Sequence, residues 1–155
     1  MQTKRIQKDV FAVIGKAGEG ATANSKEWIP PLWQEANTHF NEIAAIAKKD
    51  ENGVPLIWGA MNDVTENNKM WGERGKYMVG CEADIDAEPP AGWQKWIVPA
   101  QTYLVAECTQ DTYGEVFSSV VNDPNIKIVA TVHERYPQPS TGILELWFPI
   151  EVEGK

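Results

Sequence analysis

A glutamate near the C-terminus stands among large apolar side chains, in the stretch ILELWFPI at 143–150. Side chains alternate between the two faces of a strand, so one face is uniformly apolar while the other carries Glu145 and Trp147. If this second face lines a pocket, the loss of water disfavours a charged carboxylate until a cation arrives. A cation at about 4 Å would recover about 4 kcal/mol at an effective dielectric constant of roughly 20, and stacking on tryptophan adds ~0.5–2 kcal/mol. On the pattern alone, a hydrated glutamate on an exposed face is the favoured interpretation, and Glu145 as the anchor for a lipophilic cation is the alternative.

Glu134, in HERYP at 133–137, is a second candidate acid. On a strand it would share an inward-looking face with Val132 and Tyr136. A salt bridge to a neighbouring basic residue, or exposure near the end of the strand, is the favoured interpretation for this residue, and an inward position in a pocket is the alternative.

Tryptophan is frequent, with seven residues in a chain of 155. Its ring is large and its N–H needs a partner when buried, so a core alone rarely uses so many. The surplus favours a flat-walled cavity or a binding surface. Trp58 and Trp71 are candidate walls of a pocket, with ordinary packing as the alternative. The tryptophans are Trp28, Trp33, Trp58, Trp71, Trp93, Trp96 and Trp147.

Other chemistry has little support in the sequence. The histidines and cysteines lack the close spacing of metal ligands, and the two cysteines are interpreted as small buried side chains on strands. The glycine-rich stretch at 15–20 lacks the Gly-Lys-Ser/Thr ending of a phosphate-binding loop. No serine stands in a Gly-x-Ser-x-Gly motif. We therefore expect neither a metal nor a cofactor. The residues considered as metal ligands are His39, Cys81, Cys108 and His133.

The formal net charge is −8 and the isoelectric point is about 4.8. Binding to nucleic acid depends on basic residues that neutralise phosphates, so an acidic chain argues against direct contact with DNA or RNA. No run approaches the ~20 apolar residues of a membrane span. The apolar stretch behind the basic N-terminus is too short for a signal peptide. We expect a cytoplasmic protein.

The hydrophobic pattern predicts the order strand, helix, strand, strand, and then the same order again. An apolar stripe at three- and four-residue steps marks a helix that Trp28-Ile29-Pro30-Pro31 opens and that runs on to Ala47. The segment 84–92 carries a Pro-Pro pair and is the predicted linker. The other predicted elements are strands at 9–15, 54–62, 76–84, 96–109, 125–136 and 141–152 and a helix at 112–122.

This order predicts an α+β fold in which tandem β-α-β-β repeats share one antiparallel sheet. The chain would form a single domain over 1–155, with pseudo-repeats at about 1–88 and 89–155. A groove between two related halves is a common place for a ligand.

The sequence also resembles a known family, the GyrI-like or bacterial transcription-activator effector-binding domains. The motifs follow the order of the family over nearly the whole chain, and together they are fairly specific. They are FAVIG (11–15), WIPPLWQE (28–35), LIWGAMND (56–63), KYMVGCEAD (76–84), PAGWQKWIVPAQTYLVAE (90–107), HERYP (133–137) and ELWFPI (145–150).

The resemblance implies a ligand site between the two repeats. Several multidrug-responsive members anchor cations on the glutamate that matches Glu145. The same resemblance implies that Trp147, Tyr77, Trp33 and Phe40 are pocket walls. Many members follow a DNA-binding helix-turn-helix, for which this sequence has no room.

Three functions are compatible with these patterns. The leading one is the binding of a bulky amphipathic, cationic aromatic molecule by a sensor or sequestering module. The first alternative is a hydrolase of reactive alkylating compounds that uses a pocket glutamate as general base. The second is a protein-interaction module of the gyrase-inhibitor type, which is an analogy of fold alone. A strand edge near Pro149 also makes a homodimer conceivable.

Overall fold

The computed structural model describes residues 2–138 and 141–151. Within them, eight strands form one antiparallel sheet in the order β1-β6-β8-β7-β3-β4-β2-β5. The strands are β1 (Thr3–Lys8), β2 (Phe11–Ala21), β3 (Ile57–Asn62), β4 (Arg74–Ala83), β5 (Gln94–Val98), β6 (Gln101–Thr109), β7 (His133–Gln138) and β8 (Ile143–Pro149). Two α-helices accompany this described sheet, α1 (Ser25–Thr38) and α2 (Tyr113–Val121), and the fold is therefore α+β, as predicted.

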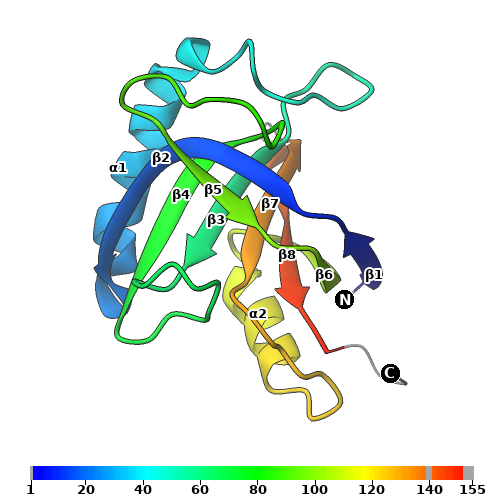
Figure 1. The fold of residues 1–155 in the computed structure, drawn as a ribbon. Helices are drawn as coiled ribbons and strands as arrows, with labels where there is room; N and C mark the ends of the chain where they lie inside the picture. Colours follow the sequence, from blue (N-terminus) through cyan, green and yellow to red (C-terminus); the bar gives the residue numbers. More distant parts are fainter. Residues whose placement is uncertain (1, 139–140, 152–155) are drawn as a thin grey trace.

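Two units of the same order build the sheet (Figure 1). The first comprises β2, α1, β3 and β4, and the second comprises β6, α2, β7 and β8. Strands β3 and β7 join the two units at the centre, where Gly59 lies opposite Glu134. Each unit also gains an outer strand from the segment that precedes the other unit in the sequence. β1, which precedes the first unit, pairs with β6 of the second, and β5, which precedes the second unit, pairs with β2 of the first. The predicted repeat is thus present, with one further strand added to each half.

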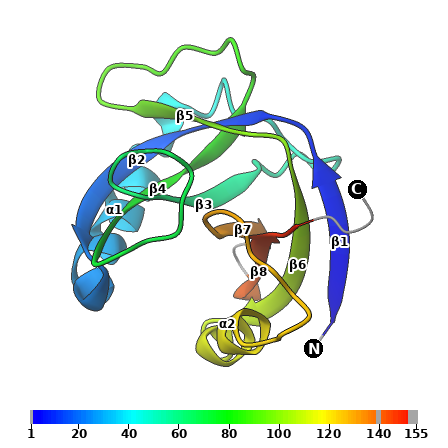
Figure 2. The same ribbon diagram turned by 60° about the horizontal axis from the view of Figure 1, so that its bottom comes forward.

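The helices lie on one face of the sheet, with α1 against β2 and β4 and α2 beside β6 (Figure 2). Alternation along each strand separates this helix face from the opposite face. On β8, Leu144, Leu146 and Phe148 pack toward α2, while Trp147 belongs to the opposite core. That opposite core is aromatic and includes Phe11, Trp58, Trp96, Tyr103 and Trp147.

Three of the predicted elements have different limits. The strand predicted at 96–109 is two strands, because Pro99 lies in the break and has no N–H to donate. The predicted long helix ends at Thr38, and a short 3₁₀ turn, η2 (Phe40–Glu42), follows it. Ile43 and Ala47 are buried, as their apolar spacing predicted, but they lie beyond the end of the helix. The strand predicted at 125–136 begins only at His133.

The start of the first helix also differs from the prediction. Ser25 begins α1, so Pro30 and Pro31 lie inside the helix instead of in its first turn. No helix in the described part of the chain is long and apolar enough to cross a membrane.

Candidate functional site

Glu134 lies on the helix face of the central strand β7, and only 6% of its surface is exposed. Its carboxylate accepts hydrogen bonds from three tyrosine hydroxyls, which come from different elements. Tyr77 on β4 and Tyr136 on β7 donate to Oε1, the latter over 2.8 Å. Tyr113, the first residue of α2, donates to Oε2. Both halves of the molecule therefore contribute to the surroundings of this acid.

Burial raises the pKa of Glu134, because a charged carboxylate loses water there. The three phenol donors favour the ionised form and offset part of this rise. Burial and the nearby carboxylate also raise the pKa of Tyr77 and Tyr113 well above the usual value, so both remain neutral donors. Among the described residues, no lysine, arginine or histidine forms an ion pair with Glu134. Within the described ranges, the site therefore holds a buried acid whose hydrogen-bond partners are neutral.

A glycine leaves the space that this cluster occupies. A Cβ atom at Gly59 would lie 2.7 Å from Oε1 of Glu134 and would overlap the hydroxyl of Tyr77. Any other residue at this position on β3 would displace the carboxylate or the phenol.

Three neighbouring cavities on the helix face share lining residues around this cluster, and together they form the groove. The central compartment has a volume of about 350 Å³ and reaches Glu134. It is lined by Ile29, Pro30, Trp33, Tyr77, Gln110, Tyr113, Glu134 and Tyr136.

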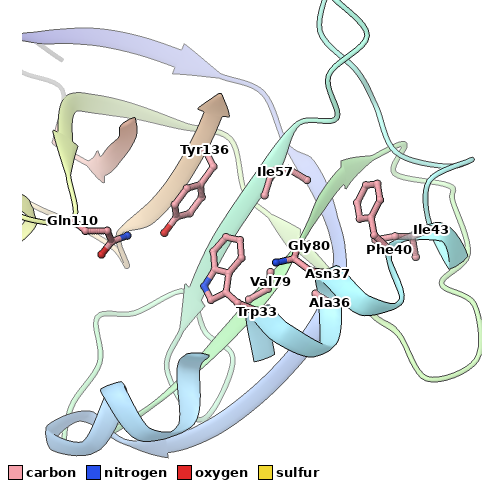
Figure 3. A pocket seen from close by; sticks show the side chains of 10 residues that line it. All are labelled: Trp33, Ala36, Asn37, Phe40, Ile43, Ile57, Val79, Gly80, Gln110 and Tyr136. Carbon is pink, nitrogen blue, oxygen red and sulfur yellow. The ribbon is translucent and has the colours of Figure 1, made fainter. Parts of the chain in front are cut away.

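Two further cavities continue the groove on either side. The α1-side compartment, of about 360 Å³, is lined by Trp33, Ala36, Asn37, Phe40, Ile43, Ile57, Val79, Gly80, Gln110 and Tyr136 (Figure 3). The loop-side compartment, of about 740 Å³, includes Met61, Met70, Trp71, Gln110, Tyr113, Phe117 and Glu134 among its walls.

Trp33 forms the aromatic wall between the central and α1-side compartments. Its indole N–H donates to the hydroxyl of Tyr77 over 3.2 Å. Its ring meets Tyr136 edge to face, with 4.7 Å between the ring centroids. These contacts fix the orientation of the indole ring, so the wall is formed before a ligand arrives.

The residues predicted to line the pocket lie on two opposite faces of the sheet. Trp33, Tyr77, Phe40 and Trp71 line the groove or its extensions on the helix face. Trp58, Trp147 and Glu145 lie on the opposite face, where the rings of Trp58 and Trp147 are 5.1 Å apart. The pleat of the sheet separates the two sets, so they do not form one pocket.

Glu145 has a different environment from Glu134. It is half-buried, and it accepts a hydrogen bond of 3.0 Å from the indole of Trp147 on its own strand. Glu107 and Arg135 are its partners across the neighbouring strands. It borders an open hollow with Thr3, Lys4 and Glu107. The expected neighbourhood of Glu145 and Trp147 is present, but on the face without helices.

Glu134 follows the inward alternative that the sequence offered for it. It is neither exposed nor part of a salt bridge among the described residues. Tyr113, Gln110 and Gly59 also belong to the site and were not predicted from the sequence. No local motif marks them, because their role comes from the pairing of β3 with β7 and from the docking of α2.

The opposite face contains two further buried polar side chains, His133 and Glu82. Burial lowers the pKa of His133 to about 4, so its ring is neutral. Its Nδ1 accepts the backbone N–H of Met61 over 3.2 Å. Glu82 accepts hydrogen bonds from Lys8 at 3.1 Å and from the indole of Trp58 at 3.0 Å. No cavity of the groove reaches these groups, and they hold the sheet together.

The paired units and the groove between their helices define an effector-binding domain. Residues 6–150 match the model of the Cass2 family, described as integron-associated effector binding protein, and the chain belongs to this family. The resemblance to GyrI-like effector-binding domains is thereby confirmed. A comparison with curated proteins found no match.

Solved structures share the fold at low sequence identity. SAV2435 bound to tetraphenylphosphonium is 17% identical, with a TM-score of 0.74 and coverage of 97% of this chain and 94% of that one. An integron cassette protein from the mobile metagenome of Vibrio cholerae is 15% identical, with a TM-score of 0.64 and coverage of 96% and 95%. EcmrR, in a complex with DNA, is 16% identical, with a TM-score of 0.59 and coverage of 97% of this chain and 57% of EcmrR.

Proposed function

We propose that this protein binds amphipathic small-molecule cations in the groove between α1 and α2, as a sensor or sequestering module, and that Glu134 is the charged anchor. The observation that carries the proposal is the buried carboxyl of Glu134, to which, among the described residues, three neutral phenols donate hydrogen bonds. A bound cation would supply the positive charge that pairs with this carboxylate.

The energetic argument rests on the dry surroundings of the acid. A positive charge about 4 Å from an ionised carboxylate gains about 4 kcal/mol at an effective dielectric constant of roughly 20. The faces of Trp33 and the tyrosines add ~0.5–2 kcal/mol of cation–π attraction for a desolvated cation. A neutral ligand of the same shape gains neither contribution, so the site should discriminate by charge.

The complex of SAV2435 with tetraphenylphosphonium supplies a probe of suitable chemistry. This ion is a lipophilic cation whose charge is independent of pH. Its aryl groups would contact the aromatic walls of the groove, while its phosphorus centre would lie toward Glu134.

The first test compares two carboxylates on opposite faces. Tetraphenylphosphonium is titrated into the protein while tryptophan fluorescence or the heat of binding is recorded. We expect Glu134→Gln to weaken binding about 10- to 100-fold, because it removes the charge but keeps the size of the side chain. We expect Glu145→Gln to change the affinity less than about twofold, since this residue lies outside the groove.

The opposite ranking of the two variants would assign the anchor to Glu145 and refute our proposal. A neutral triaryl phosphine oxide that binds as tightly as the cation would also refute it. Thermal unfolding of both variants verifies that each remains folded.

A second candidate function is hydrolysis of a reactive alkylating compound, and the raised pKa of Glu134 favours it. A carboxylate with a raised pKa is a stronger base toward water than an ordinary glutamate. Time-dependent consumption of a strained-ring alkylating probe, lost in Glu134→Gln, would distinguish turnover from binding.

A further inference from the structure

A lysine shares the loop-side compartment with the buried acid. Lys26, the second residue of α1, lines this cavity of about 740 Å³ together with Glu134. Glu134 is buried, whereas Lys26 is exposed to solvent, so the acid lies in the inner part of the cavity and the lysine at its rim. Among the described residues that line the three compartments, Lys26 is the one basic side chain.

The ammonium group of Lys26 is available to a ligand. In the part of the chain that the structure describes, no ion pair includes it. Two hydroxyl side chains, Thr22 and Ser25, line the same cavity beside it in the sequence. The hydroxyl of Thr22 donates a hydrogen bond of 2.7 Å to the carbonyl oxygen of Gly72, and the hydroxyl of Ser25 adds a neutral donor. An acidic group at the rim would therefore meet a positive charge and a hydroxyl donor.

Lys26 has opposite effects on two classes of ligand. A simple cation bound at Glu134 is attracted by the acid and repelled by the lysine. A ligand that also carries an acidic group is attracted at both ends. Without a positive charge at the rim, a protein of net charge −8 would disfavour that acidic group. One cavity with a buried acid and an exposed lysine therefore suits a ligand with both charges.

From this charge pattern we infer that the groove prefers a zwitterionic ligand, with its cationic centre at Glu134 and a carboxylate or similar acidic group at Lys26. The apolar walls of the same cavity, among them Ile29 and Trp71, contact the part of the ligand that joins the two charges. The inference deepens the proposed function and rests on it, because it assumes that Glu134 anchors a cation.

Two phosphonium probes that differ by one charge test the role of Lys26. (5-Carboxypentyl)triphenylphosphonium carries a carboxylate at neutral pH, and its methyl ester has the same skeleton without the negative charge. Dissociation constants of both probes are measured at low salt for the wild type and for Lys26→Met, which keeps an apolar stem of similar length. Lys26→Arg, which keeps the charge, is one control. Lys4→Met, which removes a charge from the exposed part of β1, is the other.

We expect Lys26→Met to weaken binding of the acid about 2- to 5-fold, which is the range of an exposed ion pair. The ester should bind this variant as tightly as the wild type, or up to about twofold more tightly, because a repulsion is removed. Both controls should leave the two affinities close to those of the wild type. Sodium chloride at about 0.5 M should remove most of the loss for the acid.

Other patterns of affinity would overturn the inference. If Lys26→Met changed both affinities by the same factor, or weakened neither, the acidic subsite would be refuted while cation binding stands. A loss for the acid that is equally large in Lys4→Met would assign the effect to net charge and would also refute the subsite. Binding of the ester that is insensitive to Glu134→Gln, or no binding of either probe, would refute the proposed function together with the subsite.

Discussion

The protonation of Glu134 couples ligand binding to pH. Burial raises the pKa of this carboxyl above its ordinary value of 4.5, so the empty site retains a proton over a range of pH in which an exposed glutamate is ionised. A permanently charged cation favours the ionised form. Binding should therefore release a proton from Glu134.

Two pH dependences follow from this shift. The affinity for tetraphenylphosphonium should increase as pH rises from 4.5 through the raised pKa, and then level off. The free energy of unfolding of the empty protein has the opposite dependence. The contribution of Glu134 is fully present below 4.5 and is lost as pH rises through the folded pKa, because the unfolded chain ionises first.

Calorimetry in buffers of different ionisation enthalpy measures the released proton, and titrations between pH 5 and 8 give the affinity profile. The Glu134→Gln variant should release no proton from this position and should show a flat profile. A wild-type affinity that does not depend on pH, with no proton released, would contradict the raised pKa.

Alternation along single strands was predictable, whereas the face that carries the groove was not. The sequence correctly placed Leu144 and Leu146 on one face of β8 and Glu145 on the other. Both faces of this sheet are apolar, however, so the pattern did not reveal which one the helices cover. The face that becomes covered depends on where α1 and α2 pack, and the sequence of a single strand does not contain this information.

At the scale of elements, the pairing of β3 with β7 builds the site. These central strands bring Gly59 and Glu134 opposite each other. The lack of a side chain at Gly59 lets the carboxylate and the Tyr77 hydroxyl share the space above β3. The order of elements was predictable from hydrophobic periodicity, but this partnership of strands 75 residues apart was not.

Gly59→Ala should damage the site and the fold together. The new methyl group would displace Glu134 or Tyr77, and we expect a loss of about 1–3 kcal/mol in the free energy of unfolding. Affinity for tetraphenylphosphonium should fall at least about 10-fold, since the acid no longer faces the groove. Urea denaturation and titration of the same preparation measure both effects.

Gly72→Ala is the matched control, because a Cβ atom at Gly72 would meet nothing within 4 Å. Its stability and affinity should stay close to those of the wild type. If Gly59→Ala behaved like this control, the close approach at β3 would not determine the position of the carboxylate.

At the scale of the whole molecule, strand exchange ties the two halves together. β1 pairs with β6 of the second unit, and the chain then crosses to β2 of the first unit. At the crossing, the ammonium group of Lys8 lies 3.1 Å from the carboxylate of Glu82 on β4 and 4.5 Å from the ring centroid of Phe11. A single side chain therefore links an outer strand of one half to an inner strand of the other.

Lys8→Met should destabilise the protein by about 2–4 kcal/mol, because Glu82 is buried and, in the described part of the chain, its carboxylate would keep a single side-chain hydrogen bond, from the indole of Trp58. Lys4→Met, on the exposed part of the same strand, should change stability by less than about 0.5 kcal/mol. Thermal and urea denaturation of the two variants give the comparison.

The double variant Lys8→Met with Glu82→Gln should recover part of the loss, since it leaves no unpaired charge. Equal stability of the Lys8→Met and Lys4→Met variants would show that the Lys8–Glu82 pair does not stabilise the connection between β1 and β2. Because the Lys8–Glu82 pair lies on the face opposite the groove, the folded Lys8→Met protein should still bind tetraphenylphosphonium with the affinity of the wild type.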